Sequence, residues 1–229
     1  MVKQNVINKK RASTPSFKDK AYKQIKDAIL FNRFRVGAVY SQESICNELK
    51  ISLTPLREAL LELQKDGYVT YYRGRGVLIT PVSKEDANHI LEARLYIERT
   101  TAYLAATRAT EENINEMKNW LDSLREKLET RDGQNLYRLD HGFHRAIAKA
   151  CGNPLLYHFC DVILDQYLRF EVKSVYNNSI DSQKVLKEHM KIFREISMHN
   201  AKKAENAMET HLNNSYKRTL SQFWNADNK

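Results

Sequence analysis

Four titratable side chains in the second half of the chain lie on helix faces that are otherwise apolar. They are Asp140, His144, His189 and His211. The first two are four residues apart, so they share one face, and each of the others lies on a separate helical stripe. A polar group that faces the interior of a bundle is costly unless it has a partner. Because imidazole and carboxylate groups bind divalent cations, the four residues predict a shared metal site.

Several alternatives stay open at this level. A single buried histidine is more often a satisfied core residue than a ligand, whereas four polar groups from three helices are better explained by one shared metal. Such a metal could be purely structural, or it could keep an open position and activate water, as in a hydrolase-like enzyme. A metal-free bundle is a further alternative. The remaining histidines are on less apolar faces and are expected to be surface or satisfied groups: His89, His141, His158 and His199.

The elements that must position these groups are helices. After Pro81 no strand signal occurs, and helical periodicity repeats between short polar breaks. Ser83 is expected to cap the first of these helices, with Glu85 and Asp86 in its first turn. The expected helices span 83–108, 110–131, 134–151, 154–177, 182–199 and 201–224. Residues 82–229 are therefore predicted to form an all-helical antiparallel bundle.

A different pattern occupies residues 51–80, ISLTPLREALLELQKDGYVTYYRGRGVLIT. Ser52 and Thr54 are candidate N-caps, Pro55 suits a first helical position, and leucines then recur at helical spacing. Gly67 is expected to end this helix. A β-prone hairpin follows, with the basic turn Arg73-Gly74-Arg75-Gly76 at its tip.

Two shorter helices are expected before this segment, at 21–31 and from Ser41 onward. Helix, helix, helix and hairpin within about sixty residues is the order of a winged helix-turn-helix, whose third helix enters the major groove of DNA. The sequence thus predicts a mainly α protein: a flexible basic arm at 1–16, a winged helix-turn-helix domain at 17–81, and the bundle at 82–229.

Charge supports this division. Residues 1–81 contain 15 Lys and Arg against 7 Asp and Glu, a balance of +8, whereas residues 82–229 contain 22 against 21, a balance of +1. A basic first third beside a neutral remainder indicates that one domain meets a polyanion. No window is long and apolar enough for a membrane span, and the N-terminus does not resemble a signal peptide. The three cysteines fit reduced thiols, so a cytoplasmic protein without membrane contact is expected.

The N-terminal segment resembles the GntR family of bacterial repressors, whose recognition helix typically has the sequence S-R-T-P-V-R-E-A-L. Here the corresponding residues are SLTPLREAL at 52–60, and the wing resembles the family pattern R-G-x-x-V. Carried over by position, the resemblance implies DNA contacts from Ser52, Thr54, Arg57, Arg73 and Gly74. For Arg57, an ion pair with a neighbouring glutamate, Glu58 or Glu62, is the alternative. One departure is clear: Leu53 replaces the usual arginine, so we expect an altered operator preference.

The bundle resembles the FCD ligand-binding domain of the FadR-type branch of this family. The resemblance is carried by Glu92-Ala93-Arg94, Asp140-x-x-Phe143-His144, Glu188-His189 and Ala207-Met208-x-x-His211-Leu212. It implies that Asp140 and the three histidines bind a divalent metal, commonly zinc or nickel, which helps hold a small carboxylate effector. Arg94 is the candidate counter-charge for that effector, and an intrahelical pair with Glu98 is its alternative.

These observations predict a transcriptional regulator, most often a repressor in this family, which binds a near-palindromic operator as a homodimer. A small organic acid is expected to modulate that binding. The hydrolase-like alternative is disfavoured because no separate general base is evident among the predicted ligands.

Overall fold

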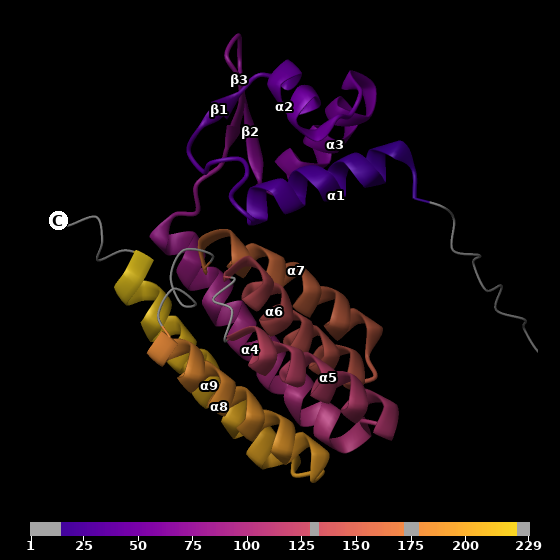
Figure 1. Ribbon diagram of the computed structural model, residues 1–229, viewed down its shortest axis with the longest axis vertical. Coiled ribbons are helices and arrows are strands. Elements are labelled where there is room, and N and C mark those ends of the chain that lie inside the picture. The colour runs from indigo at the N-terminus through magenta and orange to yellow at the C-terminus, as the bar shows by residue number, and fades with distance from the viewer. Residues whose placement is uncertain (1–14, 129–132, 172–178, 224–229) are drawn as a thin grey trace, which may run out of the picture. The chain divides into compact units, whose positions relative to one another are not determined.

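The computed structural model describes residues 15–128, 133–171 and 179–223. The chain divides into two compact units between Pro81 and Val82, and each is considered by itself (Figure 1). Most of the predicted basic arm lies outside the described residues, as do the predicted helix ends at 131, 177 and 224. Within the described residues, no helix combines the length and the apolar character needed to cross a membrane.

The first unit is a winged helix-turn-helix. Its helices are α1 (Phe17–Leu30), α2 (Gln42–Leu49) and α3 (Leu53–Lys65), and its strands are β1 (Val39–Tyr40), β2 (Val69–Tyr72) and β3 (Gly76–Ile79). α3 packs against both α1 and α2, while the antiparallel sheet has the order β1-β3-β2. Buried apolar residues from the three helices and from β3 form the core, among them Ile25, Ile45, Leu56, Leu60 and Ile79.

Two helix starts in this unit differ from the sequence prediction, and in the second unit the helix predicted from residue 182 begins at Ser179. α1 begins at Phe17 rather than Ala21, because Ser16 Oγ accepts from Asp19 N at 3.1 Å and Asp19 Oδ2 accepts from Ser16 N at 3.0 Å, a capping box. α3 begins at Leu53, so Pro55 is its third residue and not its first. The first four N–H groups of a helix have no partner within it, and proline therefore removes no hydrogen bond at this position.

The short strand β1 was not predicted, since two residues carry too little pattern to detect. It pairs antiparallel with β3, with Tyr40 opposite Val77. The pairing depends on Gly76, where a Cβ would lie 2.4 Å from the carbonyl oxygen of Tyr40. The backbone φ of Gly76 is also +121°, a region that L-residues rarely adopt. The absence of a side chain at Gly76 therefore allows β3 to pair closely with β1.

The second unit contains only helices in its described residues, which confirms the predicted fold class. They are α4 (Lys84–Arg108), α5 (Glu111–Leu128), α6 (Gly133–Ala150), α7 (Pro154–Glu171), α8 (Ser179–Ser197) and α9 (Ala201–Phe223). Ser83 caps α4 as expected, and it does so through a capping box with Asp86. Asn153 Oδ1 accepts from Leu155 N at 3.0 Å and so caps α7.

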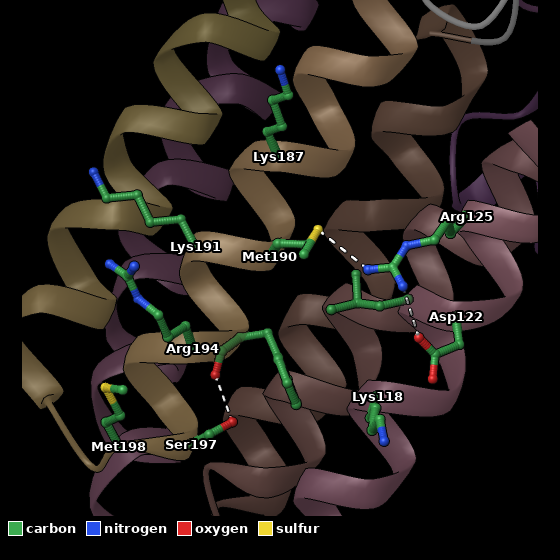
Figure 2. Close-up of a pocket in the computed structure, with 11 residues that line it drawn as sticks. Lys118, Asp122, Arg125, Lys187, Met190, Lys191, Arg194, Ser197 and Met198 are labelled. Atoms are coloured by element: carbon green, nitrogen blue, oxygen red, sulfur yellow. Dashed lines mark hydrogen bonds and ion pairs between the residues drawn. The ribbon is translucent and has the colours of Figure 1, made fainter.

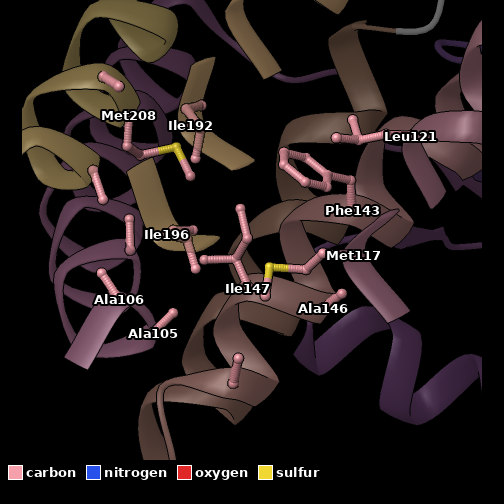
Figure 3. Packing of buried hydrophobic residues seen from close by; sticks show 14 of the residues in the cluster. Ala105, Ala106, Met117, Leu121, Phe143, Ala146, Ile147, Ile192, Ile196 and Met208 are labelled. Carbon is pink, nitrogen blue, oxygen red and sulfur yellow. The ribbon is translucent and has the colours of Figure 1, made fainter. Parts of the chain in front are cut away.

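The helix α4 is central, because it packs along α6, α7, α8 and α9. Figure 3 shows the largest buried cluster of this unit, in which Met117 of α5, Phe143 and Ile147 of α6, Ile192 of α8 and Met208 of α9 are packed together. α4 contributes small side chains such as Ala105, which let its neighbours approach closely. This core holds α6, α8 and α9, the three helices that carry the predicted metal ligands, against α4.

Candidate functional site

The structure brings all four predicted ligands together inside the helical unit. Asp140 and His144 come from α6, His189 from α8 and His211 from α9, and all four are buried. His189 Nε2 lies 3.2 Å from His144 Nε2, 3.2 Å from His211 Nε2 and 3.3 Å from Asp140 Oδ1. His189 is therefore the centre of the cluster, and one atom from each of the others is directed at its Nε2.

The outer ring nitrogens of two histidines contact carboxylates. His211 Nδ1 lies 2.8 Å from Glu188 Oε2, and His144 Nδ1 makes a short contact with Glu98 Oε2. A carboxylate next to Nδ1 accepts the N–H of that nitrogen, which leaves Nε2 with a lone pair. The lone pairs of both residues are thereby directed inward, toward His189.

Three inward atoms, namely two imidazole lone pairs and a carboxylate oxygen, then face a single nitrogen. A proton on His189 Nε2 could be donated fully to only one of them, whereas a divalent cation can accept all the lone pairs. Two nitrogens on one zinc ion at about 2.0–2.1 Å are separated by about 3.0 Å in octahedral and about 3.4 Å in tetrahedral geometry. The observed 3.2 Å separations lie within this range. His144, His189 and His211 could thus hold a metal ion.

The protonation states also suit ligands. Burial lowers the pKa of His189 well below its ordinary value, and it lowers that of His211 as well, so both rings are neutral near pH 7. Burial opposes ionisation of Asp140, but the surrounding histidines hold the pKa of its carboxyl below the usual range. Neutral imidazole and ionised carboxylate are the forms that bind a metal.

Each supporting glutamate is itself held by an arginine. Arg218 contacts both oxygens of Glu188, at 3.2 and 2.9 Å, and Asn214 Nδ2 donates to Oε1 at 2.8 Å. Burial opposes ionisation of Glu188, but hydrogen bonds from His211 and Arg218 lower the pKa of its carboxyl to about 2. This glutamate is therefore ionised at every pH at which the protein would function.

On the other side of the cluster, the Arg94 guanidinium pairs with Glu98, and its Cζ lies 4.1 Å from the ring centroid of Tyr167. Only 2% of Arg94 is exposed. The intrahelical pair, which the sequence offered as the alternative role, is thus present. Arg94 also lines a hollow of about 300 Å³ beside α4 and α9, together with Glu92, Asn213 and Tyr216.

The sequence did not predict the two glutamates that contact the histidine rings, Glu98 and Glu188. Glu98 was named as an alternative partner of Arg94, and Glu188 as part of the family pattern, but neither was expected to contact a histidine ring. His141, which was expected to be a surface or satisfied group, is not at the surface: it is fully buried, and its ring stacks on Tyr167 at 6.2 Å between centroids. His89 and His158 are exposed, as expected.

The predicted DNA contacts lie on one unit and are all exposed: Ser52, Thr54, Arg57, Arg73 and Gly74. Arg57 Nε donates to Gln42 Oε1 at 3.0 Å, so a side chain of α2 orients this guanidinium. Glu62, one of its alternative partners, instead pairs with Lys18 at 2.8 Å. Lys18, Ser52 and Thr54 line a hollow of about 510 Å³ near the starts of α1 and α3.

Comparison with known proteins gives the family. Residues 17–79 match the bacterial regulatory proteins of the gntR family, and residues 89–214 match the FCD domain. The chain belongs to the GntR family, with a C-terminal FCD domain. It is accordingly a DNA-binding transcriptional regulator.

Relatives of this GntR protein support the assignment. The regulator LutR of Bacillus subtilis is 29% identical over 195 residues, covering 76% of this chain and 87% of its own. The Uxu operon regulator of Escherichia coli is 28% identical over 222 residues, covering 89% and 86%. The solved structure of E. coli McbR/YncC is similar in fold, with a TM-score of 0.81 at 17% identity, covering 91% of this chain and 99% of that one. Because the relatives are transcriptional regulators, the hydrolase-like alternative is not supported.

Proposed function

We propose that this regulator is a repressor whose operator binding responds to a small carboxylate metabolite held near a metal in the FCD domain. The observation that carries the proposal is the convergence of His144 and His211 on His189 Nε2, each at 3.2 Å, beside the Asp140 carboxylate. When bound there, a divalent ion, zinc or nickel, would supply a positive charge that a carboxylate can bind. Two relatives, RspR of E. coli and NanR of Cronobacter sakazakii, are described as repressors.

Residues of the chain would hold and neutralise the components of this site. Glu98 and Glu188 would orient the imidazoles, and Asp140 would offset part of the charge of a bound cation. Arg94 is a candidate counter-charge for the effector, because it lines the hollow beside α4 and α9. To serve in this way, its guanidinium would have to bind both the effector and Glu98, which its several N–H donors permit.

For DNA, we propose that Ser52 and Thr54 bind phosphate oxygens and that Arg57 reaches a base edge in the major groove. Arg73 and Gly74 would contact the duplex from the wing. The exposure of all five residues and the orientation of Arg57 by Gln42 support these roles. Leu53 is 41% exposed at the start of α3, so an apolar contact with a thymine methyl would replace the arginine contact common in the family.

We further propose a homodimer on a near-palindromic operator, since one short reading helix contacts only a few base pairs and two copies multiply the specificity. An effector would act by favouring one arrangement of the two DNA-binding units, through the segment at residues 80–84. It can shift that equilibrium only as far as its affinities for the two arrangements differ.

The test begins with a duplex selected from a random pool by the purified protein. Operator binding is then measured by fluorescence anisotropy, and metal content by mass spectrometry, for the wild type and for His189→Ala. Thermal-shift screening of small organic acids with and without a chelator identifies the effector. We expect stabilising acids only in the metal-loaded protein. A wild type that carries no metal after zinc or nickel is supplied, and whose operator binding ignores both acids and chelator, would refute the proposal.

A further inference from the structure

A hollow on the helical unit lies apart from the histidine cluster. It lies between α5 and α8, with a volume of about 690 Å³, and Figure 2 shows the side chains around it. We refer to it as the α5–α8 groove. Its lining comprises mostly basic and apolar residues, which come from α5, from α8 and from Met198 directly after α8: Lys118, Leu121, Asp122, Arg125, Lys187, Met190, Lys191, Phe193, Arg194, Ser197 and Met198.

The groove concentrates positive charge on a unit whose total charge is nearly neutral. Five of its lining residues are lysine or arginine and one is acidic, a balance of +4, whereas residues 82–229 together have 22 basic and 21 acidic residues. Asp122, the acidic one, is 3.8 Å from Arg125. A concave surface with charge of one sign attracts a partner of the opposite sign.

The apolar part of the lining, which we call the floor of the groove, consists of Leu121, Met190, Phe193 and Met198. Leu121 is buried, whereas Met190 and Met198 are 42% and 61% exposed. Arg125 Nη2 lies 3.5 Å from Met190 Sδ, so the cationic rim and the apolar floor are in contact. Exposed methionines adapt their shape readily and are common at protein-binding surfaces. Phosphate backbones would leave this apolar floor unused, which argues against DNA as the occupant.

We propose that the α5–α8 groove binds an acidic amphipathic helix of a partner protein. Lys187 and Ser197 are ten residues apart on α8, and at 1.5 Å per residue this corresponds to about 15 Å, or nearly three turns of a docked helix. An amphipathic helix in a groove buries its apolar side on the floor, and its flanking charges meet the rim. A second copy of this chain does not suit the same surface, because two-fold symmetry would bring like-charged rims together.

The test uses a synthetic, fluorescein-labelled peptide of three to four turns, with leucines on one face and glutamates on its flanks. Two matched peptides replace either the glutamates by lysine or the leucines by serine. Fluorescence anisotropy with the full-length protein measures their binding. The variant Lys118→Glu/Lys191→Glu changes the rim on both sides, and Lys202→Glu/Lys203→Glu makes the same charge change at exposed sites on α9. Operator binding and circular dichroism check that both variants fold.

We expect the acidic peptide to bind the wild type and the α9 control alike, and to bind the groove variant at least tenfold more weakly. Both matched peptides should bind at least tenfold more weakly than the acidic one. Equal binding of the serine peptide would mean attraction by charge alone and would overturn the proposal. Equal loss in the α9 control would do the same. A groove variant whose oligomeric state differs from that of the wild type would identify the groove as a self-association surface instead.

Discussion

The substitution Glu188→Gln tests whether the second layer of the histidine cluster governs metal binding. Glu188 accepts from His211 Nδ1 at 2.8 Å, and this interaction keeps the lone pair of His211 Nε2 directed at His189. Glutamine has nearly the same shape but no charge, and its amide NH₂ can face Nδ1 and favour the other tautomer. Removing such a partner typically weakens metal affinity about 10–100-fold, or about 1.4–2.7 kcal/mol.

The loss of metal affinity in Glu188→Gln can be followed by thermal unfolding. At metal concentrations about 1,000-fold above the dissociation constant, binding stabilises the wild type by about 4.1 kcal/mol. A thirtyfold weaker variant would gain only about 2.1 kcal/mol under the same conditions. The metal-free variant also loses charge-assisted hydrogen bonds from Arg218, so the comparison is between metal-loaded and metal-free forms of each protein. Titration against a chromophoric chelator measures the affinity directly.

The matched control is Glu195→Gln, the same change on the same helix. Glu195 is buried and pairs with Arg194 and Asn200, two partners outside the histidine cluster. We expect its metal affinity to equal that of the wild type. Unchanged affinity in Glu188→Gln, or an equal loss in Glu195→Gln, would show that the glutamate–histidine contact does not position a ligand. A wild type that binds no metal would instead refute the metal site itself.

Four further predictions concern the DNA-binding unit. Arg57→Ala should weaken binding to the selected duplex by about 1–3 kcal/mol in anisotropy titrations, and an equal loss on random DNA would mean a phosphate contact. Gly76→Ala should destabilise the protein by about 2 kcal/mol or more in thermal melts, because its Cβ would clash with the backbone of β1. Gly74→Ala meets no atom within 4 Å and should cost only about 1–2 kcal/mol, for its φ of +72°. Operator affinity should fall steeply between 50 and 200 mM salt, and a flat response would contradict phosphate contacts.

Much of the fold followed from local sequence. Apolar residues at helical spacing, interrupted by short polar segments, predicted the helices of the bundle. Ser83 marked the start of α4, where it forms a capping box with Asp86. The glycine-rich basic turn at 73–76 gave the wing. Local rules were incomplete at α1, which a capping box of Ser16 and Asp19 starts at Phe17, four residues before the predicted start. They also missed β1, whose two residues are held by backbone pairing with a strand that comes almost forty residues later.

For the site, the sequence determined which residue types share a face: Asp140 and His144 lie one turn apart on α6, and His189 and His211 lie on apolar stripes. Only the tertiary structure decided that these faces meet, and that His189 lies at the centre. It also decided that Glu98 supports a histidine 46 residues later and that Glu188 supports one 23 residues later. Helical spacing fixes the face on which a side chain lies, but the packing of α4, α6, α8 and α9 fixes which faces come into contact.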